Sequence, residues 1–187
     1  MQHQPDILNA DGAALVVIDV QERINAVMAD QLHVPRLTVL VRAFQALGLP
    51  VLLTEQYPQG LGSTIPDLAT IVGSVPLVKD TFSCGRDPAF LSKLEKVGPR
   101  QVVLTGIEAH VCVAQTALDL LHAGYRVQIP HDAVCSRRNI DREWALRRLQ
   151  QAGVTVTSTE SALFELLDRC GTDDFRTVSK LLKVIPV

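Results

Sequence analysis

The sequence has little of several features that mark specialised classes of protein. Aromatic residues make up only 4% of its 187 residues, which leaves few side chains for stacking against nucleic-acid bases. The 18 basic and 20 acidic residues give a formal charge of −2, so no excess of positive charge indicates binding to nucleic acid or to an anionic membrane surface. We therefore expect no nucleic-acid partner.

Features of membrane, secreted and disulfide-rich proteins are also missing. No apolar run reaches the roughly 20 residues that a membrane-spanning helix needs, and residues 1–6 lack the basic and apolar regions of a secretory signal. The chain has four cysteines and no Cys-x-x-Cys pair, so a disulfide scaffold is not expected. We predict a cytoplasmic protein with reduced thiols and no membrane partner.

What is present is enough apolar sequence for a substantial core. Hydrophobic residues make up 47% of the chain, and 187 residues suit one domain of ordinary size. We expect a single domain over residues 1–187, with its core at about 13–167 and an apolar tail at 168–187. The end of that tail, 181–187, is strongly apolar for a terminus, and we predict that it docks on a neighbouring subunit of a homo-oligomer.

Short apolar runs alternate with helical patterns along the chain. The run Ala-Leu-Val-Val-Ile at 14–18 is typical of a strand buried on both faces. Further strands are predicted at 51–54, 76–79, 101–105, 125–129 and 154–157, and helices at 34–47, 88–97, 111–123, 141–152 and 161–167. This alternation predicts a three-layer α/β/α fold with a doubly wound sheet of six parallel strands. Ligands of such folds bind at the carboxyl ends of the strands.

Three reactive side chains follow strand ends. Asp19 closes the first run, Lys79 ends the third, and Cys112 begins the helix after the fourth. A cysteine at a helix start faces the positive end of the helix dipole, which favours the thiolate, and the free N–H groups there can form an oxyanion hole. Each residue also has an ordinary alternative. Cys112 could be a small buried hydrophobic residue, Asp19 a helix or loop cap, and Lys79 a solvated charge. Their joint placement at one sheet edge favours an active site.

Two segments resemble a known family. Residues 15–21 (Leu-Val-Val-Ile-Asp-Val-Gln) and 105–117 (Thr-Gly-Ile-Glu-Ala-His-Val-Cys-Val-Ala-Gln-Thr-Ala) are similar to the aspartate and nucleophile motifs of the isochorismatase-like cysteine hydrolases. Lys79 falls between them, as the family lysine does, and the resemblance extends from about residue 13 to 167. It implies the strand order 3-2-1-4-5-6, in which the first and fourth strands are neighbours.

The resemblance also implies a chemistry. Asp19 would take the thiol proton, Cys112 would attack a carbonyl carbon to form a thioester, and Lys79 would pair with Asp19 and stabilise the thiolate. The backbone N–H groups of Glu108 and Cys112 would hold the oxyanion, in a loop with a cis peptide before Glu108. The expected activity is hydrolysis of a small amide or a related carbon–nitrogen bond of a small-molecule substrate.

The sequence departs from two branches of that family. Nicotinamidase-type members bind a metal through an aspartate and histidines after the second strand, whereas 54–60 contains no histidine and Gln56 stands where the aspartate would be. We therefore expect no metal and no cofactor. Isochorismatases proper lack the cysteine, so Cys112 argues against hydrolysis of a vinyl ether. The segment Thr-Glu-Gln-Tyr-Pro at 54–58 is closest to the isochorismatase domain-containing branch.

The remaining candidates are weaker. We expect Gln56, Tyr57, Phe82 and Cys84 to line the substrate pocket, and Cys84 has a second interpretation as a redox partner of Cys112. The rival hypothesis is accordingly a catalytically silent or thiol-redox oligomeric protein on the same fold. Cys135 and Cys170 are expected to be structural and His110 to be a surface loop residue, three assignments made from sequence position.

Overall fold

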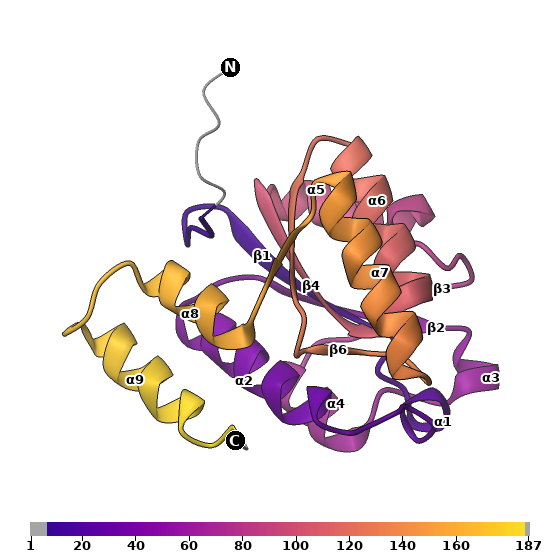
Figure 1. Cartoon of the computed structure of the whole chain (residues 1–187), viewed down its shortest axis with the longest axis horizontal. Helices are drawn as coiled ribbons and strands as arrows, with labels where there is room; N and C mark the ends of the chain where they lie inside the picture. Colours follow the sequence, from indigo (N-terminus) through magenta and orange to yellow (C-terminus); the bar gives the residue numbers. More distant parts are fainter. Residues whose placement is uncertain (1–6, 186–187) are drawn as a thin grey trace.

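The computed structural model describes residues 7–185, which form an open, parallel sheet between two layers of helices (Figure 1). Six strands lie in the order β3-β2-β1-β4-β5-β7, and the short β6 pairs with β4. Their bounds are β1 Ala13–Ile18, β2 Val51–Gln56, β3 Leu77–Lys79, β4 Gln101–Ile107, β5 Arg126–Pro130, β6 Val134–Cys135 and β7 Thr155–Thr157. The predicted fold class and order are confirmed, with β7 as the predicted sixth strand, and β6 was not predicted.

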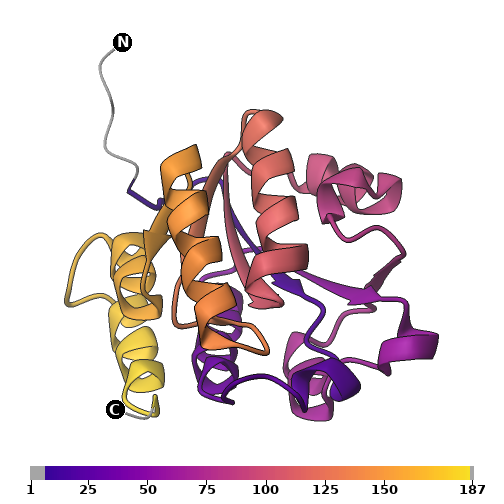
Figure 2. The ribbon, with the colours of Figure 1, turned by 45° about the vertical axis from the view of Figure 1, so that its right-hand side comes forward.

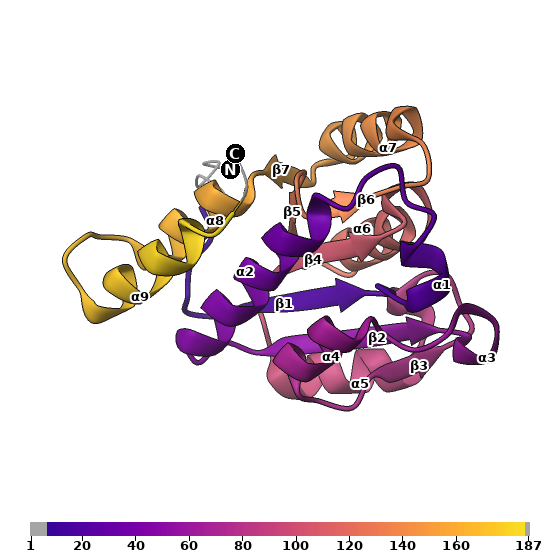
Figure 3. The same ribbon diagram turned by 90° about the horizontal axis from the view of Figure 1, so that it is seen from below.

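Helices cover both faces of the sheet (Figures 2 and 3). One apolar cluster joins the sheet to α2 (His33–Ala46), α4 (Pro66–Val72), α8 (Thr159–Leu167) and α9 (Asp173–Leu182). A second cluster joins the other face to α5 (Pro88–Val97), α6 (Ala114–His122) and α7 (Asn139–Ala152). Because β1 and β4 lie between these clusters, every residue of both strands is buried, as continuous apolar runs require.

Four short elements form the loops at the carboxyl ends of the strands. They are α1 (Glu22–Asn25), α3 (Pro58–Leu61), a 3₁₀ turn η1 (Cys84–Arg86) and a π-helical turn η2 (Ala109–Val113). Elements of three to five residues carry no readable hydrophobic period, and the sequence did not predict α1, α3 or η1. No helix within 7–185 is long and apolar enough to cross a bilayer.

The C-terminal region contains a helix where only an apolar tail was expected. In α9, Thr172 caps the first turn by accepting from the Phe175 N–H at 3.0 Å, and Val178 is buried against the core. Leu181, Leu182 and Ile185 also pack partly buried against the chain's own core. Val184, by contrast, is 71% exposed. Residues 1–6 and 186–187 lie outside the described residues. They include the segment predicted to lack a secretory signal and the last two residues of the tail.

The approach of β1 to β4 depends on one glycine. Gly106 pairs with Ile18 in the parallel register and has φ +104°. A Cβ atom at this position would lie 2.1 Å from the Ile18 carbonyl oxygen, a distance that atoms do not tolerate. This glycine therefore allows the end of β1 to lie directly beside the loop that follows β4.

We predict that Gly106→Ala destabilises the fold far more than Gly124→Ala. Gly124 also has a positive φ, +91°, but a Cβ there would meet nothing within 4 Å. The control should lose only about 1 kcal/mol of unfolding free energy from the left-handed backbone, whereas Gly106→Ala should lose about 3 kcal/mol or more because the clash is added. Urea denaturation measures both values, and equal losses would contradict the argument.

Candidate active site

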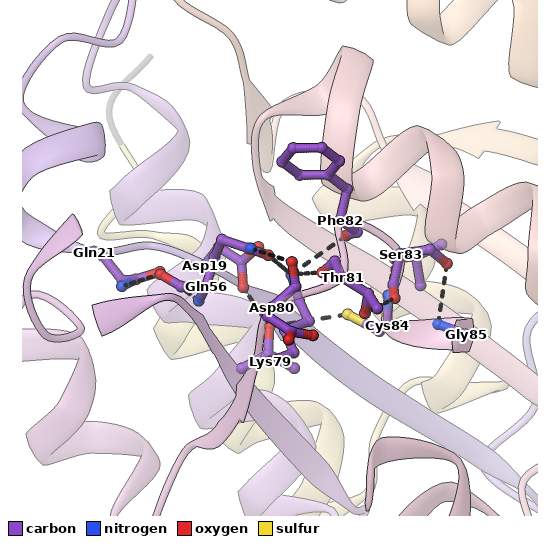
Figure 4. A network of polar contacts seen from close by, with 12 residues as sticks. Asp19, Gln21, Gln56, Lys79, Asp80, Thr81, Phe82, Ser83, Cys84 and Gly85 are labelled. Atoms are coloured by element: carbon purple, nitrogen blue, oxygen red, sulfur yellow. Dashed lines mark hydrogen bonds and ion pairs between the residues drawn. The ribbon is translucent and has the colours of Figure 1, made fainter. Parts of the chain in front are cut away.

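Asp19 stands directly after β1 with its carboxylate turned into the protein (Figure 4). Its φ is +53°, and the residue is 1% exposed. The hydroxyl of Thr54 donates to Oδ1 at 2.7 Å, and the ammonium of Lys79 donates to Oδ2 at 2.7 Å. Both carboxylate oxygens are therefore held, as a buried charge requires.

Lys79 reaches this carboxylate from the end of β3, across the intervening strand β2. Its Nζ also donates to Gln56 Oε1 at 2.7 Å and faces the carbonyls of Thr81 and Phe82 at 3.2 and 3.3 Å. Burial on its own lowers the pKa of Lys79, but the charge of Asp19 and the hydrogen bond to it contribute to a net rise of this pKa. Lys79 is therefore a permanent cation, part of a buried ion pair.

Cys112 lies in the π-helical turn η2, immediately before α6, and is 7% exposed. Burial first, and then the negative charge of Asp19 and a hydrogen bond to it, raise the pKa of this thiol, while Lys79 opposes them. The expectation that a helix start favours the thiolate is therefore wrong for the resting site, because burial and the neighbouring carboxylate outweigh the charge of Lys79. Cys112 rests as a thiol beside a carboxylate.

The loop between β4 and η2 is firmly anchored. The Ile107–Glu108 peptide is cis, as the family resemblance implied. The Glu108 carbonyl accepts from the N–H groups of Val111 and Val113 at 3.1 and 3.2 Å. Its carboxylate accepts from Arg137, from the backbone N–H and the guanidinium, both at 3.1 Å.

A small cavity of about 80 Å³ connects these groups. It is lined by residues from four stretches of the chain, at or after the ends of β1, β2, β3 and β4: Asp19, Ile24, Gln56, Leu61, Phe82, Ile107, Glu108, Val111 and Cys112. A larger hollow of about 820 Å³, lined in part by Arg100 and Arg126, lies at the other ends of β4 and β5. We therefore assign the candidate active site to the small cavity because Asp19 and Cys112 line it, and not because of its size.

The structure places two of the four predicted pocket residues on this cavity and two elsewhere. Gln56 and Phe82 line it. Tyr57 does not, and its side chain is largely exposed. Cys84 is fully buried, with Sγ 4.0 Å from the Thr54 hydroxyl, and burial raises its pKa to about 11. It belongs to the layer beneath the site rather than to the wall.

The sequence missed the apolar part of the cavity wall. Ile24 and Leu61 come from α1 and α3, and Ile107 and Val111 from the loop around Glu108. No local pattern distinguishes such residues from ordinary core positions, since they meet only in the folded chain. Cys135 and Cys170 were both expected to be structural. Cys135 is buried, which is compatible with that role, whereas Cys170 is exposed. His110 is partly buried, with Nδ1 3.0 Å from the Ser136 hydroxyl.

The site does not fit the metal centre of nicotinamidase-type relatives. Gln56 stands at the predicted position, and its Oε1 already accepts from the Lys79 ammonium at 2.7 Å. The same cation occupies one oxygen of Asp19. A divalent ion here would face a fixed positive charge, so no chemical step at this site is assigned to a metal.

Comparison with known proteins identifies the family. The family model "Isochorismatase domain" matches residues 13–161. The chain is 40% identical over 177 residues to isochorismatase domain-containing protein 2 of Danio rerio, covering 94% of this chain and 89% of that protein. The chain belongs to the isochorismatase family. Membership supports a hydrolase activity of isochorismatase-like type.

Other known proteins are similar to this chain over most of its length. The chain is 37% identical over 178 residues to the secreted isochorismatase effector Isc1 of Phytophthora sojae, covering 91% of this chain and 84% of the effector. A structure described as MAR1 ribonuclease from Caenorhabditis elegans has a TM-score of 0.88 and 35% identity, covering 96% and 94% of the two chains. The Escherichia coli YcaC product, described as an octameric hydrolase of unknown specificity, shares the fold with a TM-score of 0.85 at 22% identity, covering 95% and 88%.

The electrostatics of this isochorismatase-family site predict opposite effects of two substitutions on thiol reactivity. Asp19→Asn removes a cause that raises the Cys112 pKa, so alkylation at pH 7 should become faster, by about tenfold for each unit by which the pKa falls. Lys79→Met removes the charge that lowers this pKa and should slow the reaction. Iodoacetamide labelling read by peptide mass spectrometry measures both rates.

The exposed Cys170 provides the internal reference for this experiment. In the wild-type protein Cys112 should react more slowly than Cys170 at neutral pH, and its rate should rise only well above the ordinary thiol pKa of about 8.5. Circular dichroism must show that both variants are folded, because each removes one partner of a buried pair. An unchanged or slower Cys112 reaction in folded Asp19→Asn would contradict the argument.

Proposed function

We propose that the chain hydrolyses a small carboxamide, or a related carbon–nitrogen bond, with Cys112 as the nucleophile. One observation carries this proposal: the Cys112 thiol and the Asp19 carboxylate line the same small cavity, and Lys79 holds that carboxylate from behind at 2.7 Å. An acyl group in the cavity would meet a thiol that already has a base within hydrogen-bonding reach.

The first half-reaction forms a thioester. As Cys112 Sγ attacks the carbonyl carbon, its proton passes to Asp19, and the carbonyl oxygen takes the negative charge. The backbone N–H groups of Glu108 and Cys112 would stabilise this oxyanion. When the carbon–nitrogen bond breaks, Asp19 returns the proton to the leaving nitrogen, which departs as ammonia or an amine.

The second half-reaction releases the acid. Asp19 takes a proton from water, the hydroxide attacks the thioester carbon, and the carbon–sulfur bond breaks. The proton held by Asp19 then returns to sulfur and restores the thiol. Lys79 holds the Asp19 carboxylate in position through both half-reactions, because its Nζ donates to Oδ2 at 2.7 Å.

The size and the lining of the cavity suit a substrate with a small, uncharged acyl group. Apolar side chains form most of its wall, among them Ile24, Leu61 and Val111. Its volume of about 80 Å³ is far below the roughly 300 Å³ of a pocket for a drug-sized ligand. Phe82, which is 56% exposed, lies at its rim.

The test is ammonia release from a panel of aliphatic and aromatic carboxamides. Cys112→Ala should abolish turnover, with a loss of about 10³-fold or more, whereas Cys170→Ala should leave it within twofold because that cysteine is exposed and outside the cavity. RNA cleavage, which releases no ammonia, is followed separately by gel electrophoresis, because the C. elegans relative is described as a ribonuclease.

The rival hypothesis has a distinct signature. A catalytically silent or thiol-redox protein would show no Cys112-dependent turnover on any carboxamide. A redox role would instead give a Cys84–Cys112 disulfide after peroxide treatment, detectable by mass spectrometry. The burial of Cys84 and its raised pKa of about 11 argue against a reactive thiol at that position.

We also propose a cytoplasmic homo-oligomer. Four free cysteines suit a reducing compartment. Ile140 and Trp144 on α7 are 50% and 60% exposed, and exposed apolar side chains of this size are typical of subunit contacts. Light scattering should give a multiple of the chain mass, and Trp144→Glu should reduce it; a monomeric wild-type protein would refute the assembly.

A further inference from the structure

A second cluster of reactive side chains lies outside the active site. Asp30 precedes α2, His33 is the first residue of α2, and Cys135 ends β6. One ligand atom from each lies within 4.8 Å of the others. None of the three lines the active-site cavity, and from the sequence we expected no metal.

His33 is prepared to act as a ligand. The residue is 2% exposed, and its Nδ1 is buried without a hydrogen-bond partner. Its Nε2 lies 3.0 Å from Asn25 Oδ1, and Asn25 Nδ2 donates to Gln31 Oε1 at 2.9 Å. Because Asn25 thus presents its oxygen, the Nε2 atom carries the ring proton, and Nδ1 has a free lone pair.

A buried acceptor without a partner costs free energy, and a ligand at Nδ1 would remove that cost.

We propose that Asp30, His33 and Cys135 bind a divalent transition-metal ion of the zinc type. Carboxylate oxygen, imidazole nitrogen and thiolate sulfur are the donors that such ions take, with water in a fourth position. Tetrahedral zinc places its donors about 3.3–3.6 Å apart, so a pair of atoms at the 4.8 Å limit would move closer by about 1 Å on binding. Asp30 is only partly buried and can make that movement.

The charges of the cluster balance. The Cys135 thiol, now 3.7 Å from the Asp30 carbonyl and 3.5 Å from the Ser136 carbonyl, releases its proton to solvent as the sulfur–metal bond forms. The carboxylate and the thiolate then neutralise the divalent ion.

The ion would fasten the segment before α2 to β6. That segment already donates from the Ala29 N–H to the Ser136 carbonyl at 3.1 Å. Cys135 pairs with Ile107 in the sheet, next to the loop that carries Glu108. The proposed metal is thus structural, and it does not depend on the proposed hydrolase activity.

Cobalt(II) is the probe for this site, because thiolate coordination gives near-ultraviolet charge-transfer absorption and tetrahedral geometry gives visible bands. The protein carries Cys112→Ser and Cys170→Ser, so that neither the active-site thiol nor the exposed thiol contributes. One equivalent of cobalt should bind, zinc should displace it, and zinc should raise the melting temperature.

Cys135→Ser should remove the charge-transfer band, and His33→Ala should weaken zinc binding by about 100-fold or more. The matched controls Cys84→Ser and His122→Ala, outside the cluster, should keep the binding. Asp30→Asn, at a partly exposed position, provides a third variant if either of the others fails to fold. Absence of a stoichiometric cobalt complex, or equal zinc binding in all folded variants, would overturn the proposal.

Discussion

The buried ion pair between Lys79 and Asp19 is the interaction on which the site depends. Both side chains are about 1% exposed and meet at 2.7 Å. Taking two charges out of water costs several kcal/mol for each ion, which only good geometry and further hydrogen bonds offset. Thr54 provides one of these bonds and Gln56 another. Since the participants come from the ends of β1, β2 and β3, one electrostatic network fixes the positions of three neighbouring strands.

The same pair determines the resting state of the nucleophile. Asp19 raises the pKa of Cys112 and Lys79 lowers it, and together with burial the balance favours the thiol. In the proposed mechanism, proton transfer to Asp19 moves a negative charge from oxygen to sulfur without changing the net charge of the site. A buried site tolerates such a transfer far better than it tolerates a permanent extra charge. Keeping the sulfur protonated until a carbonyl arrives also limits its reaction with oxidants, which attack the thiolate.

The sequence predicts the parts of this arrangement that local pattern controls. Continuous apolar runs predicted β1 and β4, and the Asp-Pro start and glycine stop of α5 gave its bounds to the residue. Strand ends placed Asp19, Lys79 and Cys112 at one edge. The pocket predictions that failed depend on where a side chain points and on what surrounds it. Cys84 follows β3, yet its side chain is buried beneath the site, and Tyr57 is exposed. The raised Cys112 pKa follows from burial, which sequence position alone does not specify.

Among the elements that the sequence missed, β6 holds the loop after β4. Two residues are too few for a periodic signal, but Ile107 pairs with Cys135 in this strand. The next two residues continue the contact, because Ser136 lies 3.0 Å from His110 Nδ1 and Arg137 donates to the Glu108 carboxylate at 3.1 Å. The loop that carries Glu108 is therefore held on one side by the register of β1 and β4, through Gly106, and on the other side by β6. A loop fixed from two sides keeps its N–H groups oriented before substrate arrives, which is the condition under which such groups stabilise a developing charge without reorganisation.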